Sequence, residues 1–240
     1  MLAAGMGKRM NSDLPKVLHP ALGKPLVVHV LDQLKPLRPD RVVIVVGHKE
    51  ELVRAALKDR TVQFVTQVPQ LGTGHAVQVA WDEVQPGAGI VMVLAGDMPL
   101  VRTVSLKRLL ERHAGELNGA TFLSALLDDP TGYGRVIKSH RGEFVKIVEE
   151  KDALPAERKV SEVNSGIYCF SKEPLRDALS RLSSENSQKE YYLTDTLALM
   201  KEKGLRVGVE LAADSRECFG VNTPEQLRMV EETLQAWGEG

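Results

Sequence analysis

The chain has 240 residues, of which 43% are hydrophobic, and its 31 basic and 32 acidic residues give a formal net charge of −1. This length is enough for an α/β domain with a full core, and the near-zero charge excludes a general attraction to nucleic acid or to a membrane surface. No apolar run reaches the roughly 20 residues that span a bilayer, and Cys169 and Cys218 lack C-x-x-C spacing, so we expect a cytoplasmic protein with reduced thiols.

A loop rich in glycine and positive charge follows the first apolar residues. Leu2-Ala3-Ala4-Gly5 leads into Gly7 and Arg9, and Lys16 follows after Pro15. Glycines let backbone N–H groups approach phosphate oxygens, and Arg9 and Lys16 supply charge where pyrophosphate would leave. The spacing fits neither the Walker loop nor the G-x-G-x-x-G dinucleotide motif. An ordinary glycine-rich turn with solvated basic residues is the alternative.

Apolar runs typical of strands alternate with helical periodicity through the first half of the chain. We expect strands at 41–46, 62–66 and 90–95, and helices at 50–57, at 74–84 and from Pro25, which would lie in a first helical turn. This order predicts a mainly parallel sheet. Residues 1–3 look like the end of a central strand whose beginning is missing, so we expect a truncated or misassigned start.

Polar residues follow the expected strand at 62–66. Ligands of parallel sheets bind beyond the carboxyl ends of the strands, and there Gln67 precedes a turn that contains Gly72 and Thr73. A glutamine amide can read the edge of a base, and the free N–H groups of the turn can meet a base carbonyl or a phosphate. Thr73 could equally cap the following helix, and both roles can hold at once.

Asp97 and Asn222 also stand between an expected strand and a helix. An apolar strand that delivers Asp97 to its end is a common way to present a carboxylate to Mg²⁺, which takes few protein ligands and fills its other positions with phosphate oxygens and water. The alternative roles are a helix cap for Asp97 and a turn residue for Asn222.

The second half indicates a mixed-sheet lobe at roughly 119–170 within a single domain of residues 1–240. We expect strands at 120–127, 134–138, 144–150 and 163–170, then helices at 174–182 and 191–203. Strands at 205–211 and 218–221 and a helix at 224–237 would complete the fold.

The opening pattern, L-x-x-G-x-G-x-R-M followed by Pro15-Lys16, resembles the signature of sugar-phosphate nucleotidyltransferases. Further motifs, above all D-D-P-T-G-Y-G-R at 128–135 and E-Y-Y-L-T-D at 190–195, resemble the N-acetylglucosamine-1-phosphate uridyltransferase domain of the bifunctional bacterial GlmU family. The resemblance covers nearly the whole chain. It implies an α/β, Rossmann-like fold: a mixed, mainly parallel sheet with helices on both faces and a small β lobe on the sugar side. It also implies transfer of a uridylyl group from UTP to N-acetylglucosamine-1-phosphate with Mg²⁺.

The resemblance also implies site residues. Arg9 and Lys16 would act in catalysis on the triphosphate, and Asp97 and Asn222 would bind the metal. The uridine nucleotide would contact Leu2, Ala3, Ala4, Gly5, Gln67, Gly72 and Thr73, and the sugar phosphate would contact Ala95, Gly96, Asp97, Gly134, Glu149, Asn164 and Thr194. Taken alone, Glu149 could also be a solvated charge on an edge strand.

The sequence departs from the family pattern in two further respects. Ala95 stands where many relatives have a tyrosine, and the hexapeptide repeats of the family's acetyltransferase β-helix are absent, which predicts a monomer or weak oligomer without acetyl transfer. The alternative functions are nucleotidyl transfer to another hexose-1-phosphate and non-catalytic binding of a nucleotide sugar.

Overall fold

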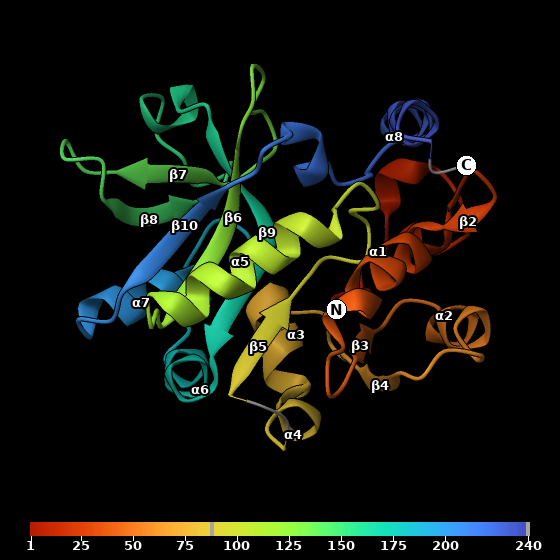
Figure 1. Ribbon diagram of the computed structural model, residues 1–240, viewed down its shortest axis with the longest axis horizontal. Helices are drawn as coiled ribbons and strands as arrows, with labels where there is room; N and C mark the ends of the chain where they lie inside the picture. Colours follow the sequence, from red (N-terminus) through yellow and green to blue (C-terminus); the bar gives the residue numbers. More distant parts are fainter. Residues whose placement is uncertain (87–88, 239–240) are drawn as a thin grey trace.

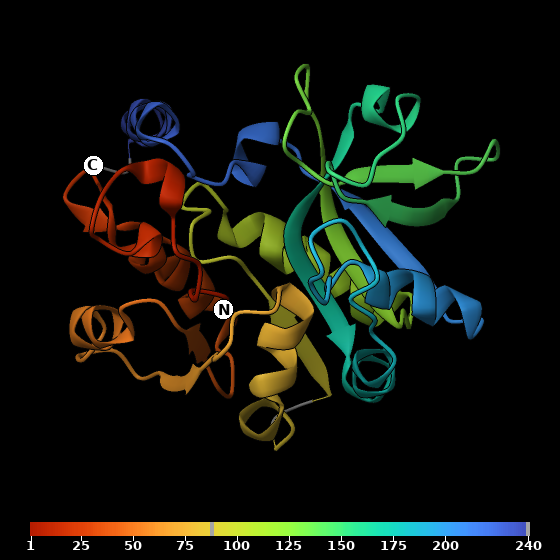
Figure 2. The ribbon, with the colours of Figure 1, turned by 180° about the vertical axis from the view of Figure 1, so that it is seen from behind.

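The centre of the molecule is a mixed sheet with helices on both faces (Figure 1). The computed structural model describes residues 1–86 and 89–238. The first half supplies strands β3 (Val43–Val46), β4 (Gln63–Thr66) and β5 (Ile90–Val93); the second supplies β6 (Ala120–Leu126), β9 (Glu162–Ser171) and β10 (Val207–Leu211). Helices α1 (Leu26–Leu34) and α5 (Thr103–Gly115) pack on one face, and α3 (Thr73–Val79), α6 (Lys172–Ser180) and α7 (Asp195–Glu202) pack on the other (Figure 2). This arrangement confirms the expected fold class.

Leu2 joins the two parts of the sheet. It forms parallel bridges to Val45 on one side and to Ala95, just after β5, on the other. Beyond Leu2, β3 pairs in parallel with β4, while β5 pairs antiparallel with β9. The sheet continues from β9 to β6 in antiparallel and from β6 to β10 in parallel. The predicted first strand is therefore central, although it is reduced to a bridge.

A small hairpin extends the second half of the sheet. Strands β7 (Arg135–Lys138) and β8 (Phe144–Val148) pair antiparallel, and Arg135 pairs with Val163 of β9. The Arg135 side chain is buried and forms an ion pair of 2.7 Å with Glu150. Because a buried guanidinium needs a charged partner, this pair fixes the loop that follows β8.

Short strands, helices and 3₁₀ turns make up the rest of the described structure. Strands β1 (Pro20–Ala21) and β2 (Lys24–Pro25) form a short hairpin against α8 (Pro224–Ala236). Helices α2 (Glu50–Ala56) and α4 (Trp81–Val84) and five 3₁₀ turns complete the described chain: η1 (Lys8–Met10), η2 (Lys16–Leu18), η3 (Lys35–Leu37), η4 (Glu157–Lys159) and η5 (Ser215–Cys218). Among the described residues, no helix is both long enough and apolar enough to cross a membrane.

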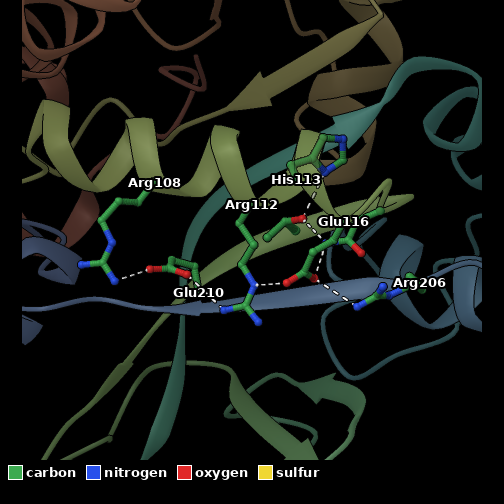
Figure 3. Close-up of polar contacts among 8 residues, drawn as sticks. Arg108, Arg112, His113, Glu116, Arg206 and Glu210 are labelled. Atoms are coloured by element: carbon green, nitrogen blue, oxygen red, sulfur yellow. Dashed lines mark hydrogen bonds and ion pairs between the residues drawn. The ribbon is translucent and has the colours of Figure 1, made fainter.

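Charged side chains attach α5 to the edge strand β10 (Figure 3). Glu210 of β10 lies between Arg108 and Arg112 of α5, at 2.7 and 3.1 Å. At the next residue of the helix, the ring of His113 is buried and lies 3.1 Å from the Thr121 hydroxyl of β6. These contacts hold α5 against the sheet. They therefore also fix the end of the loop that carries Asp97 and leads into α5.

The structure corrects several expected boundaries. The expected strand at 218–221 is wrong, because Cys218 ends the turn η5 and the residues that follow form a loop. Pro25 belongs to strand β2, and α1 begins one residue later. The expected helix at 74–84 is divided at Ala80 into α3 and α4. A two-residue strand such as β2 has no periodicity of its own, and its pairing depends on the hairpin around it.

Candidate active site

The opening loop leaves the sheet just after Leu2, which lies between the carboxyl ends of β3 and β5. The carbonyl of Leu2 accepts a hydrogen bond of 2.9 Å from Gly96 N, and the Ala4 carbonyl accepts one of 2.7 Å from the Gln70 side chain. A Cβ on Gly96 would lie 3.2 Å from the Leu2 carbonyl oxygen, tighter than most contacts of this kind. Glycine at this position therefore lets two strand ends, and the residues expected to bind nucleotide and sugar, approach each other.

Gln67, Gly72 and Thr73 form a second part of the site. The Gln67 side chain is 4% exposed, and its amide donates to the Gly72 carbonyl at 2.9 Å. Gly72 has φ +104°, and a Cβ there would lie 2.7 Å from the Tyr191 carbonyl oxygen. Thr73 does not cap α3: Gly72 is the N-cap, and the Thr73 hydroxyl accepts a bond of 3.0 Å from Leu193 N. This turn is thus fixed against the segment that leads to Thr194.

Charged and amide side chains from distant parts of the chain meet above these strand ends. The side-chain oxygen Oδ1 of Asn222 accepts hydrogen bonds from Arg9 at 2.9 Å and from Lys16 Nζ at 3.1 Å. Lys16 also forms an ion pair with Asp97. The structure therefore brings together all four residues that the sequence assigned to the triphosphate and the metal.

Backbone contacts place Asp97 and Asn222 in this cluster. Val221 N donates to the Asp97 carbonyl at 2.9 Å, and Asn222 N donates to the Gln226 side chain at 2.7 Å. The N-cap of α8 is Thr223, whose hydroxyl accepts from Gln226 N. Asp97 is likewise not a cap, because α5 begins after Arg102. Both side chains are consequently free of capping roles and point oxygen atoms at cations.

The cluster suits a magnesium ion that shares its coordination with a substrate. A carboxylate from Asp97 and an amide oxygen from Asn222 are hard oxygen donors, which Mg²⁺ prefers, and both oxygens already contact the ammonium group of Lys16. Within residues 1–86 and 89–238, no group of three or more His, Cys, Asp or Glu side chains could hold a metal. The donor set therefore fits an ion that is completed by phosphate oxygens and water.

The residues expected on the sugar side gather around β8 and β9. Glu149 Oε1 accepts a hydrogen bond of 3.1 Å from the Thr194 hydroxyl. A Cβ on Gly134 would lie 2.9 Å from Ile147 and 3.4 Å from Glu149 Oε2, so glycine keeps this carboxylate accessible from the backbone of the neighbouring strand. Asn164 donates through Nδ2 to the Tyr168 hydroxyl at 2.7 Å, and its Oδ1 accepts from Gly166 N.

Glu149 is not a solvated charge. Burial raises the pKa of its carboxyl, and the nearby carboxylates of Asp195, Asp152 and Glu190 raise it further, while the Thr194 hydrogen bond lowers it. A carboxyl held in this way can accept a hydrogen bond from a sugar hydroxyl that enters the site.

Tyr133 lies beside the charged cluster and was not singled out from the sequence. Burial raises the pKa of its phenol, the carboxylate of Asp97 adds to the effect, and a hydrogen bond with the backbone of Gly220 opposes it. Tyr133 thus connects the segment before β7 to the loop that carries Asn222. Its place inside the D-D-P-T-G-Y-G-R motif is the only sequence signal that could have indicated this role.

Comparisons with known proteins show the family of the chain. The profile of the MobA-like NTP transferase domain matches residues 1–194. The chain is 43% identical to the "Bifunctional protein GlmU" of Clostridium beijerinckii over 98% of its length and 51% of the relative. It is 47% identical to the protein of the same name from Streptococcus equi subsp. zooepidemicus, with the same coverage. The chain thus spans about half the length of the curated relatives it matches.

A solved structure shares the fold. It is described as a putative glucose-1-phosphate thymidylyltransferase from Bacillus anthracis in complex with a sucrose, and it superposes with a TM-score of 0.74 at 21% sequence identity. The match covers 97% of this chain and 92% of that structure. At this identity the likeness shows the fold alone.

Proposed function

Because this chain belongs to the family of MobA-like NTP transferase domains, we propose that it transfers a uridylyl group from UTP to N-acetylglucosamine-1-phosphate. The products would be UDP-N-acetylglucosamine and pyrophosphate. The observation that carries the proposal is the convergence of Arg9 and Lys16 on the oxygens of Asn222 and Asp97. The identity of 43% to 47% with proteins named GlmU supports the choice of substrates.

The reaction requires charge neutralisation more than proton transfer. A phosphate oxygen of the sugar phosphate attacks the α-phosphorus of UTP in line, one P–O bond forms, and the bond to the bridging oxygen of pyrophosphate breaks. The attacking oxygen is already anionic, so a general base is unnecessary. Arg9 and Lys16 offset the negative charge that grows on the departing pyrophosphate.

Asp97 and Asn222 are the residues that would hold Mg²⁺. When bound, the ion would neutralise phosphate charge and orient the reacting groups. Before any ligand enters, Lys16 supplies the positive charge at these two oxygens. In the working enzyme Lys16 would turn from them to the triphosphate.

The nucleotide would bind at the opening loop and the sugar phosphate at the lobe. The buried Gln67 amide and the turn at Gly72 and Thr73 would recognise the uracil. The N–H groups of Leu2 and Ala3 already donate to Leu94 and Val45, so backbone N–H groups for the nucleotide would come from Ala4 and Gly5. On the other side, Glu149 can accept from sugar hydroxyls, and Asn164 keeps one N–H of its amide available for the N-acetyl group.

We propose that the protein acts in the cytoplasm, as a monomer or a weak oligomer. Cys169 and Cys218 are both buried and free, which suits a reducing compartment.

The decisive test measures pyrophosphate release from UTP with purified protein and Mg²⁺. Release should require N-acetylglucosamine-1-phosphate, and glucose-1-phosphate or dTTP should support it far less. A faster rate with another hexose-1-phosphate or another nucleotide would reassign the substrates. Binding of UDP-N-acetylglucosamine without any turnover would show a binding module instead.

A further inference from the structure

The side-chain amide of Gln67 is held in one orientation. Gln67 is 4% exposed, and its nitrogen Nε2 donates a hydrogen bond of 2.9 Å to the Gly72 carbonyl. Because a carbonyl oxygen can only accept, the amide nitrogen faces Gly72 and the amide oxygen Oε1 faces away from it. The same nitrogen lies 3.1 Å from Nδ1 of His75. The second N–H of the amide is therefore shared with a histidine that the proposed function does not use.

This contact determines where His75 carries its proton. A neutral imidazole has one nitrogen that donates and one that accepts. Because the amide nitrogen of Gln67 is a donor, Nδ1 of His75 accepts, and the ring proton lies on Nε2. A proton on Nδ1 would place two donors against each other. The two residues thus fix each other: Gln67 selects the tautomer of His75, and His75 restrains the amide of Gln67.

Tyr191 holds both acceptors in place. Its N–H donates to the Leu71 carbonyl at 2.8 Å, and its carbonyl accepts from Gly74 N at 2.7 Å, so the turn around Gly72 is bound to it on both sides. The ring of His75 lies beside the Tyr191 ring, with 6.4 Å between the two centroids. Tyr191 belongs to the E-Y-Y-L-T-D motif at 190–195, which thereby supports the turn and the histidine together.

The oxygen of the Gln67 amide is left for a ligand. Among the described residues, none donates a hydrogen bond to Oε1. Nor is Oε1 one of the described side-chain atoms that are enclosed without a partner, so a ligand can reach it. An acceptor that is fixed in this way distinguishes pyrimidines by the atom they present: uracil carries an N–H at N3, whereas N3 of cytosine is itself an acceptor.

We propose that His75 is a positioning residue that sets the base specificity of the site, because it holds the Gln67 oxygen toward the N3–H of uracil. With the amide reversed, its nitrogen would donate to N3 of cytosine instead. His75 and the Gly72 carbonyl together oppose that reversal; without His75 the amide keeps one restraint and has one unpaired N–H. The proposal rests on the proposed transfer from UTP, whose base it concerns.

Paired variants of His75 test the proposal through calorimetric binding of UTP and CTP without a sugar phosphate. His75→Leu removes the acceptor, so the dissociation constant for UTP should rise about tenfold, and the preference for UTP over CTP should fall at least about fivefold. His75→Asn is close to leucine in size but carries an oxygen that can replace Nδ1, so it should keep the preference within about twofold. His140→Leu, at an exposed position between β7 and β8, is the control and should change neither constant.

NMR of the ¹⁵N-labelled protein tests the tautomer without any nucleotide. At pH 8, Nε2 of His75 should carry the proton, and Nδ1 should have the chemical shift of an unprotonated nitrogen. A proton on Nδ1 would overturn the proposal, as would equal binding of UTP and CTP by the natural protein. An unchanged preference in His75→Leu, or an equal loss in both His75 variants, would also overturn it. Missing turnover would refute the proposed transfer alone, because the tautomer and the binding preference are measured without it.

Discussion

Asp97 combines a backbone role with a side-chain role. Its carbonyl accepts from Val221, whereas its carboxylate contacts Lys16. Asp97→Asn keeps the size and the backbone bond but removes the charge. We expect turnover to fall by at least about 100-fold with little change in melting temperature.

Asp177→Asn is the matched control, because Asp177 is an exposed carboxylate paired with Lys203 on the far side of the molecule. It should leave turnover unchanged. Full activity of the Asp97 variant would remove this residue from the metal site.

Lys16 is expected to act on the transition state more than on substrate binding. Negative charge accumulates on pyrophosphate only as the bond breaks, so the ammonium group gains most of its interaction at that stage. Lys16→Ala should lower kcat by about 100-fold and raise KM for UTP by less than about fivefold. Steady-state kinetics separate the two effects. Unchanged kcat with a much higher KM would show that Lys16 only binds the nucleotide.

Glu149 gives the stability of the protein a defined pH dependence. Its native pKa is raised above the unfolded value of 4.5, mainly by burial. The native state therefore binds this proton more tightly, and the contribution is lost as the pH rises through the native pKa. Glu149→Gln stays neutral, so its gain in melting temperature over the natural protein should be larger at pH 8 than at pH 5. Glu185→Gln, at an exposed carboxylate, should show no such difference, and a constant offset for Glu149→Gln would refute the assignment.

The turn before α3 depends on one backbone conformation. Gly72 has φ +104°, and a Cβ there would lie 2.7 Å from the Tyr191 carbonyl oxygen. Gly72→Ala should lower the free energy of unfolding by about 1–3 kcal/mol. Thermal or urea denaturation measures this. Gly115→Ala is the control, because its new Cβ would meet nothing within 4 Å, and an equal loss there would exclude the steric explanation.

Long periodic elements were predictable from the sequence, and short ones were not. The β-branched run of β3 and the amphipathic pattern of α8 place both elements within two residues of their observed bounds. The hairpin of β1 and β2 has too few residues for a pattern, and η5 resembles a strand because Cys218 is buried. The site followed from motifs, but the meeting of Arg9 with Asn222, 213 positions apart, required the fold.

At the scale of the molecule, the described strands all belong to the mixed sheet, its hairpin extension and the small hairpin of β1 and β2. The family builds its acetyl-transfer pocket between coils of a β-helix, whose hexapeptide repeats this sequence lacks. We therefore predict that these 240 residues transfer uridylyl groups but not acetyl groups. Incubation with acetyl-CoA and glucosamine-1-phosphate should give no N-acetylated product above background. A clear acetylation rate would contradict this prediction.

Strand β9 pairs with strands from both halves of the chain. Its later residues pair with β5 of the first half, nearly its whole length runs beside β6, and its start carries Asn164 and the link to β7. A rotation of one half against the other would have to break hydrogen bonds inside this strand's own ladders. These ladders tie β5 to the strands of the second half, so we expect the loops that bear Arg9, Lys16 and Asn222 to adjust when substrates arrive.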